Sequence, residues 1–179
     1  MNWLEFKKIS EREFKYIELE GGLFGYQMQP GTKWNKGLSD DQIRKLEDKF
    51  GFKLSNDYRD FIKVMNGIDT ELISIDPFEL EDDSYSQLYY EYPKDCERIS
   101  ALLEEIDKFK ECIDEVLTDA GFSVSDIEGY VPTYAHRSLV VFKDKSLSPV
   151  ISVWGSDVVV LAENLEEYWI KELGLEYCF

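Results

Sequence analysis

The chain has 179 residues, of which 44% are hydrophobic and 15% aromatic, so it can fill one sizeable core and is not expected to be disordered. Acidic residues outnumber basic ones by 37 to 20, and the net charge of −17 disfavours direct binding to nucleic acid or to anionic membranes. The same charge would attract a basic protein partner and speed their encounter, although acidity can also serve solubility alone.

The cysteines and the N-terminal sequence indicate a cytoplasmic protein. Cys96, Cys112 and Cys178 are far apart and form no C-x-x-C pair, which disfavours both a disulfide framework and a zinc site. The first residues, MNWLEFKKISEREFKYIE, lack the apolar run of a signal peptide, and no segment is apolar enough to span a membrane. We expect a single domain over residues 1–179.

The first 37 residues predict an extension made of a short helix and an irregular loop. Residues 2–9 place Trp3, Phe6 and Ile9 on one side of a helix. Residues 21–37, GGLFGYQMQPGTKWNKG, are rich in glycine and aromatics and predict a loop packed by its own rings. The PGTK within it lacks the spacing of a phosphate-binding P-loop, so no such site is expected. The core would then span residues 38–175.

Two amphipathic helices follow, joined by a short linker. Ser39 and Gln42 have the spacing of a capping box, and Gly51 is a typical residue at the end of a helix. Ser55 is expected to cap the second helix, which would end at Asn66-Gly67. Each helix shows one apolar face, so both must pack on another element.

The middle of the chain changes character twice. Residues 70–78, TELISIDPF, alternate and are β-branched, which predicts a strand. An acidic and then tyrosine-rich stretch follows. Residues 95–120 carry apolar residues at steps of three and four, which predicts an amphipathic helical insertion, with a break possible within it.

The last third predicts an antiparallel sheet and a closing helix. Residues 136–142 and 149–162 are short β-rich runs, and Gly155-Ser156 suits a tight hairpin turn. Asn164 should cap the final helix, with Glu167 three residues later. The expected fold class is therefore α+β, with an antiparallel sheet packed against a cluster of helices.

Residues that could carry chemistry are few. His136 is the only histidine, and a structural role at the start of a strand is favoured over catalysis or metal binding. Trp154 is expected in the core. Glu79, Glu81, Asp82 and Asp83 form an acidic cluster without the glycine of a calcium loop. A solvated or partner-facing loop is favoured over a pair of catalytic carboxylates, and no cofactor or metal is expected.

Tyrosines accompany the acidic cluster. Tyrosines beside exposed acidic residues can bind a protein partner at a low cost in side-chain entropy. Tyrosines at alternate positions can equally cover a core, and the sequence leaves both possibilities open. The predicted partner-binding residues are Glu79, Glu81, Asp82, Asp83, Tyr85, Tyr89, Tyr90 and Glu91.

The helix pair GLSDDQIRKLEDKFGFKLSNDYRDFIKVMNG, residues 37–67, resembles the signature of the SUKH superfamily, also called the Smi/Knr group. The usual proline is replaced by Ser55, which would keep the capping role through its side-chain oxygen. The matching positions are Gly51, Leu54, Asp57, Tyr58, Arg59, Phe61, Asn66 and Gly67.

The C-terminal part is similar to the same superfamily in its run of strands closing on a short helix. His136 and Arg137 fit the pattern, while Ala135 stands where a glycine is common. The resemblance covers about two thirds of the chain, from Gly37 to roughly Leu80 and from Gly129 to Leu173.

The resemblance implies a non-enzymatic α+β domain. Bacterial members look like immunity proteins that bind and neutralise a toxin, often a nuclease, and fungal relatives are regulators of cell-wall synthesis. We therefore expect a cytoplasmic antitoxin that uses an acidic surface against a basic toxin domain. The alternative is a non-catalytic regulatory or scaffold module, and a carboxylate-based hydrolase is the least favoured reading.

Overall fold

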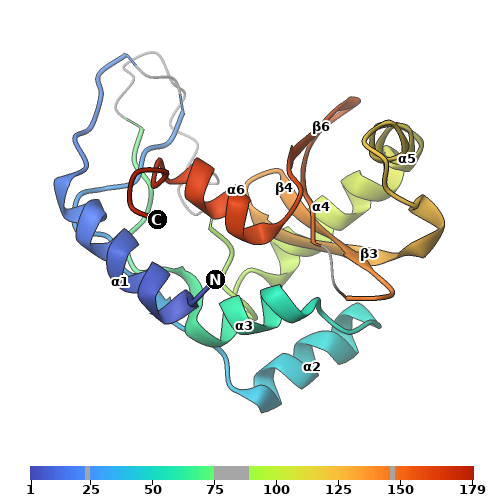
Figure 1. Ribbon diagram of the computed structural model, residues 1–179, viewed down its shortest axis with the longest axis horizontal. Helices are drawn as coiled ribbons and strands as arrows, with labels where there is room; N and C mark the ends of the chain where they lie inside the picture. Colours follow the sequence, from blue (N-terminus) through green and yellow to red (C-terminus); the bar gives the residue numbers. More distant parts are fainter. Residues whose placement is uncertain (23–24, 75–88, 146–147) are drawn as a thin grey trace.

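The computed structural model describes residues 1–22, 25–74, 89–145 and 148–179, and over these ranges the fold is α+β (Figure 1). The strands form two antiparallel sheets, one of order β1-β2 and one of order β3-β4-β5-β6. The elements are α1 (Trp3–Glu13), η1 (Phe14–Tyr16), β1 (Trp34–Lys36), α2 (Asp40–Phe50), α3 (Asn56–Val64), β2 (Met65–Ile68), α4 (Cys96–Lys108), α5 (Lys110–Asp119), η3 (Val124–Asp126), β3 (Ile127–Tyr134), β4 (Arg137–Phe142), β5 (Val150–Trp154), β6 (Asp157–Ala162) and α6 (Leu165–Glu172).

The larger sheet is covered on both faces, and alternation along its strands divides the side chains between two cores. Val140 and Ile151 are buried in one cluster with Ile113 of α5. Leu139 and Val150, their neighbours along the same strands, are buried in the other cluster with Trp169 of α6. Figure 1 shows α4 and α5 lying on the opposite side of this sheet from α6.

An aromatic cluster joins the two ends of the chain to the motif helix. The Trp34 ring lies 5.6 Å from the Trp169 ring, 6.1 Å from Phe61 and 5.9 Å from Tyr89, all in edge-to-face geometry. Phe61 in turn stacks on Trp169 at 5.4 Å. Such pairs contribute about 0.5–1.5 kcal/mol each beyond their burial, so the cluster is a major source of stability.

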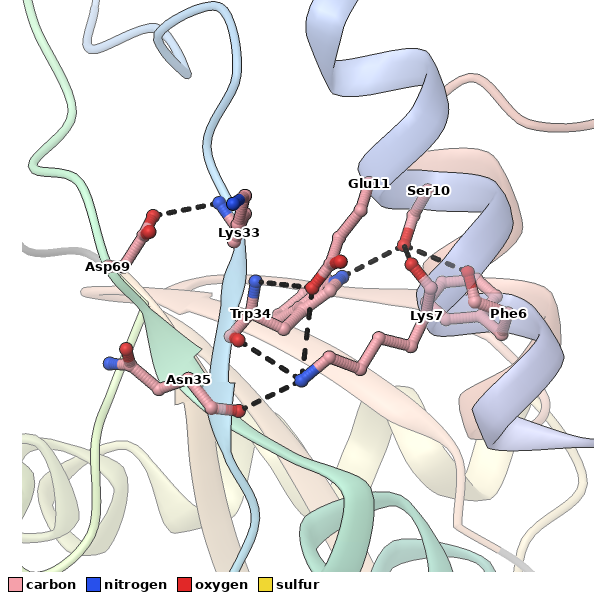
Figure 2. Close-up of polar contacts among 8 residues, drawn as sticks. All are labelled: Phe6, Lys7, Ser10, Glu11, Lys33, Trp34, Asn35 and Asp69. Carbon is pink, nitrogen blue, oxygen red and sulfur yellow. Dashed lines mark hydrogen bonds and ion pairs between the residues drawn. The ribbon is translucent and has the colours of Figure 1, made fainter.

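Helix α1 binds the backbone of β1 through its side chains (Figure 2). Ser10 Oγ accepts a hydrogen bond from the indole Nε1–H of Trp34 at 2.9 Å. Glu11 accepts from the backbone N–H of Trp34 at 3.1 Å, and the ammonium of Lys7 donates to the carbonyls of Trp34 at 3.1 Å and of Asn35 at 3.4 Å. These contacts satisfy backbone groups that an edge strand would otherwise expose.

Two predictions for the sheet regions are wrong. Residues 34–36 form β1 instead of an irregular loop, because β2 lies alongside and pairs Trp34 with Ile68. The predicted strand at 70–78 is absent from residues 70–74, where Ile73 makes only an isolated bridge to Gln27. Residues 75–78 lie outside the described residues.

The second motif helix also differs from the prediction at both ends. It stops at Val64 instead of at Asn66-Gly67, because Met65–Ile68 leaves the helix to pair with β1. Ser55 occupies the N-cap position, but its Oγ is buried and has no hydrogen-bond partner among the described residues. The helix begins on the Ser55 carbonyl, which accepts from Arg59 N at 2.9 Å.

Other local predictions are confirmed. Ser39 and Gln42 form the capping box, and Gly51 ends α2 in the left-handed conformation with φ of 79°. Asn164 accepts from the backbone N–H of Glu167 at 2.9 Å and caps α6. The helical insertion breaks at Phe109, which separates α4 from α5.

Gly37 lies in close contact with the backbone of α3, and a side chain there should be strongly destabilising. A Cβ at this position would lie 2.2 Å from the carbonyl carbon and oxygen of Lys63, which are backbone atoms that cannot rotate away. We expect Gly37→Ala to lower the free energy of unfolding by at least about 2 kcal/mol in urea titrations. Gly21→Ala is the control, because a Cβ on Gly21 meets nothing within 4 Å. Equal effects of the two substitutions would contradict the packing.

Candidate partner-binding surface

The predicted partner-binding residues divide into two groups. Five of the acidic residues and tyrosines, together with the chain around them, lie outside the described residues: Glu79, Glu81, Asp82, Asp83 and Tyr85. Their role in partner binding stays a prediction. Tyr89, Tyr90 and Glu91 are described, and they lie on a segment that returns to the core.

Tyr89 and Tyr90 are core residues and cannot act as exposed contacts in this structure. They are only 7% and 8% exposed. Tyr89 stacks on Tyr134 with ring centroids 4.3 Å apart, and the Tyr90 hydroxyl donates to the Ala135 carbonyl at 2.6 Å. Burial raises the pKa of Tyr90 to about 12. For these two tyrosines, the alternative that they cover the core is the correct one.

Beside these tyrosines lies an acidic cleft of about 190 Å³. Among the described residues of its wall, four are acidic, Asp69, Glu71, Glu91 and Asp95, and one is basic, Lys94. The described residues that line it are Ile68, Asp69, Thr70, Glu71, Tyr89, Glu91, Lys94 and Asp95, and we call this set the acidic cleft.

The carboxylates of the acidic cleft are held in place by short polar contacts. Asp69 accepts from Lys33 N at 2.8 Å, and Asp95 accepts from Glu91 N at 2.7 Å. Glu91 lies 3.6 Å from the Lys94 ammonium and also accepts from the Asn35 side chain at 3.3 Å. An excess of fixed negative charge in a concave surface favours cationic groups and repels phosphate.

Two motif residues attach the cleft wall to the core. The Asn66 side chain donates to the carbonyl of Tyr92 at 2.7 Å and accepts from its N–H at 3.0 Å. Gly67 has φ of 77°, and a Cβ there would lie 3.0 Å from the Cβ of Glu91. The Asn-Gly pair that the sequence suggested as a helix exit therefore positions the segment that carries Glu91.

The buried carboxylate of Glu47 connects the two motif helices. It is ion-paired with Arg59, lies 2.9 Å from Lys53, and accepts from Leu54 N at 3.1 Å. Burial alone would raise the Glu47 pKa, but the hydrogen bonds from Lys53, Arg59 and Leu54 outweigh it and lower the pKa below its usual value. No local sequence pattern marks Glu47, because its partners come from the next helix and the linker.

The remaining motif residues of the helix pair are structural. Leu54, Tyr58 and Phe61 are buried in the main core. Asp57 accepts from the hydroxyl of Ser148 at 2.7 Å, which ties α3 to the loop before β5. Among the residues that the structure describes, no group of histidine, cysteine, aspartate and glutamate is arranged to hold a metal ion.

The sequence profile of the SMI1 / KNR4 family (SUKH-1) matches residues 37–170, well over half of the chain. The chain belongs to this family. Neither a curated protein nor a solved structure matches it significantly. The matched range of this SUKH-1 protein includes both motif helices, the helical insertion and the whole larger sheet.

The second motif of the SUKH-1 domain, His136-Arg137, lies at the β3–β4 turn. His136 is in the turn instead of opening a strand, because β4 begins only at Arg137. Ala135 takes φ of 47°, which explains why glycine suits this position. Arg137 lies over the Tyr134 ring at 4.6 Å and 3.5 Å from the carboxylate of Glu172. Burial raises the pKa of Glu172, and Arg137 opposes that rise.

Trp154 was expected in the core, but it is 62% exposed. Its neighbour Val153 points into the cluster beneath α4 and α5, so strand alternation directs Trp154 to the opposite face. Trp154 is the last residue of β5, and it belongs to neither buried cluster. In the described parts of the SUKH-1 protein, no helix has the length and hydropathy to cross a membrane.

The Glu47 ion pairs should stabilise the SUKH-1 domain in a pH-dependent way. Because the folded pKa of Glu47 is lowered, its contribution is present above the ordinary value of 4.5 and is lost as the pH falls through the folded pKa. We expect Glu47→Gln to lower the free energy of unfolding at pH 7 by about 1–3 kcal/mol, measured by urea titration. The difference from the wild type should narrow progressively below pH 4.5.

Asp41→Asn provides the matched control for Glu47→Gln. Asp41 is ion-paired with Arg44, but both side chains are more than half exposed, so its removal should cost less than about 0.5 kcal/mol. A Glu47→Gln effect that stayed constant between pH 7 and pH 3 would show that charge at this position is not what stabilises the domain.

Proposed function

We propose that this SUKH-1 protein is an immunity protein that binds a cognate toxin domain and neutralises it. The toxin domain would be basic, as expected of a nuclease that must bind phosphate, and the protein would cover it with an acidic surface. Family membership supports a role as an interaction domain. The proposal assigns no catalytic residue and no cofactor, since binding alone blocks a toxin whose active site is covered.

The acidic cleft is the observation that best supports a basic partner. Four acidic residues and one basic residue among its described lining favour the entry of an arginine or lysine side chain. The residues that line the cleft come before and after the acidic stretch 79–83 in the sequence. The net charge of −17 would further steer a positively charged toxin toward the protein before contact.

Charge reversal should weaken toxin binding without unfolding the protein. We expect Glu81→Lys with Asp83→Lys to reduce affinity for the toxin by at least about tenfold, mostly through slower association, and to reduce the dependence of the association rate on salt. The measurement is surface plasmon resonance against toxin domains encoded beside this gene, at several salt concentrations. Thermal unfolding should be nearly unchanged.

The matched control reverses two exposed acids on α5, Glu111→Lys with Glu115→Lys, and so makes the same change in net charge. This variant should retain most of the affinity. Equal losses in both double variants would mean that only total charge matters. If no adjacent toxin binds and the protein instead captures an endogenous component of cell-wall synthesis, the regulatory role replaces the immunity role.

A further inference from the structure

Trp154 is the exception among the four tryptophans of the chain. Trp3, Trp34 and Trp169 are buried at 6%, 4% and 1% exposure, whereas Trp154 is 62% exposed. An exposed tryptophan leaves a large apolar ring in water, and tryptophan is among the residues most enriched at the energetic centres of protein interfaces. Its surroundings indicate what it could bind.

The strand register places a carboxylate beside the exposed indole. Trp154 and Asp157 are cross-strand partners on either side of the tight turn at Gly155, so their side chains leave the same face of the sheet. Asp157 is exposed and has no ion pair among the described residues. The next pair along this face is Ser152 with Val159, and Val159 is 45% exposed.

Residues of the β3–β4 turn and of α4 contact the indole and the turn that follows it. The His136 ring meets the Trp154 ring edge-on, with centroids 5.3 Å apart, and the His136 carbonyl accepts from Val153 N at 3.0 Å. Gly155 N donates to the carboxylate of Glu105 at 3.3 Å, which anchors the turn to α4. Burial and then the charge of Arg137 lower the pKa of His136, so this imidazole takes up a proton less readily than a free one.

We propose that Trp154 and Asp157 form a receptor for an arginine side chain of a basic protein partner. A guanidinium can stack on the indole face and at the same time bind the neighbouring carboxylate with its N–H groups. The inference rests on the proposed function, because it names a second contact, made of residues other than those of the acidic cleft, for the same basic partner. In Figure 1, β6 runs from the periphery of the molecule to α6, which leaves its first residues at an outer edge.

The test uses a short peptide, acetyl-Gly-Arg-Gly-amide, with its citrulline analogue, titrated into the intact protein. The readout is the indole N–H signal of Trp154 in two-dimensional NMR spectra, assigned by its loss in Trp154→Phe. We expect the arginine peptide to shift this signal saturably and to leave the signals of the three buried tryptophans in place. The citrulline analogue, which has the same shape without the charge, should bind at least about threefold more weakly.

The substitution Asp157→Asn should weaken binding of the arginine peptide at least about threefold. Asp48→Asn, on the exposed face of α2, makes the same change in net charge and should leave the affinity unchanged. The inference is overturned if the Trp154 signal does not move, or if the two asparagine variants behave alike. Both asparagine variants remove exposed carboxylates, so neither is expected to disturb folding.

The peptide titration is independent of any toxin, which separates the two proposals. If the protein neutralises an adjacent toxin while the peptide leaves Trp154 unaffected, the arginine receptor is wrong and the proposed function stands. If the peptide binds as expected but no toxin does, the proposed function is wrong and the receptor stands. Where a toxin does bind, Trp154→Ala and Asp157→Asn should each weaken that complex, and an unchanged affinity would overturn the receptor's role in it.

Discussion

The structure depends on the contacts of one residue, Trp34. Its backbone and its indole N–H are bound by side chains of α1, and its ring meets Phe61 of the motif helix and Trp169 of the closing helix. Trp34 precedes the range that matches the SUKH-1 profile. The segment before residue 37 is therefore part of the folded core, because it supplies β1 to the smaller sheet and the indole of Trp34 to the main core.

This core also determines where the acidic cleft lies. Tyr89 packs against both Trp34 and Trp169. Three residues later, the backbone of Tyr92 is hydrogen-bonded to the Asn66 side chain. Glu91 is thereby held beside β2, in contact with Asn35 of β1. Because these contacts use buried rings and backbone groups, they fix the position of the segment whatever its exposed side chains are. The exposed residues of a binding surface can therefore vary in sequence without loss of the fold.

Features that depend on neighbours within a few residues could be predicted from the sequence. The capping box at Ser39, the glycine that ends α2 and the cap at Asn164 each need only local geometry, and each is confirmed. The errors at Tyr89, Trp154 and β1 involve distant partners, whereas the error at Ser55 is local. The sequence around Tyr89 and Trp154 does not show whether either side chain is buried. Tyr89 is buried because it stacks on Trp169, and Trp154 is exposed because the alternation of side chains along β5 directs it away from the core. Likewise, β1 exists only because β2 pairs with it, and the cleft joins residues 68–71 to residues 89–95.

Carboxylates stabilise the fold at one place and are proposed to bind a partner at another, and the local balance of charge separates these two roles. Glu47 is buried, but Lys53, Arg59 and the backbone N–H of Leu54 bind its carboxylate, so its charge is neutralised within the domain. Within the described part of the cleft wall, Lys94 is the one basic residue and it pairs with Glu91, while Asp157 makes no ion pair among the described residues. An unneutralised carboxylate held at the surface costs the fold little, because water solvates it, and it retains its full attraction for an incoming cation. We infer that negative charge in excess of the internal cations, and not acidity as such, marks where a basic partner would bind.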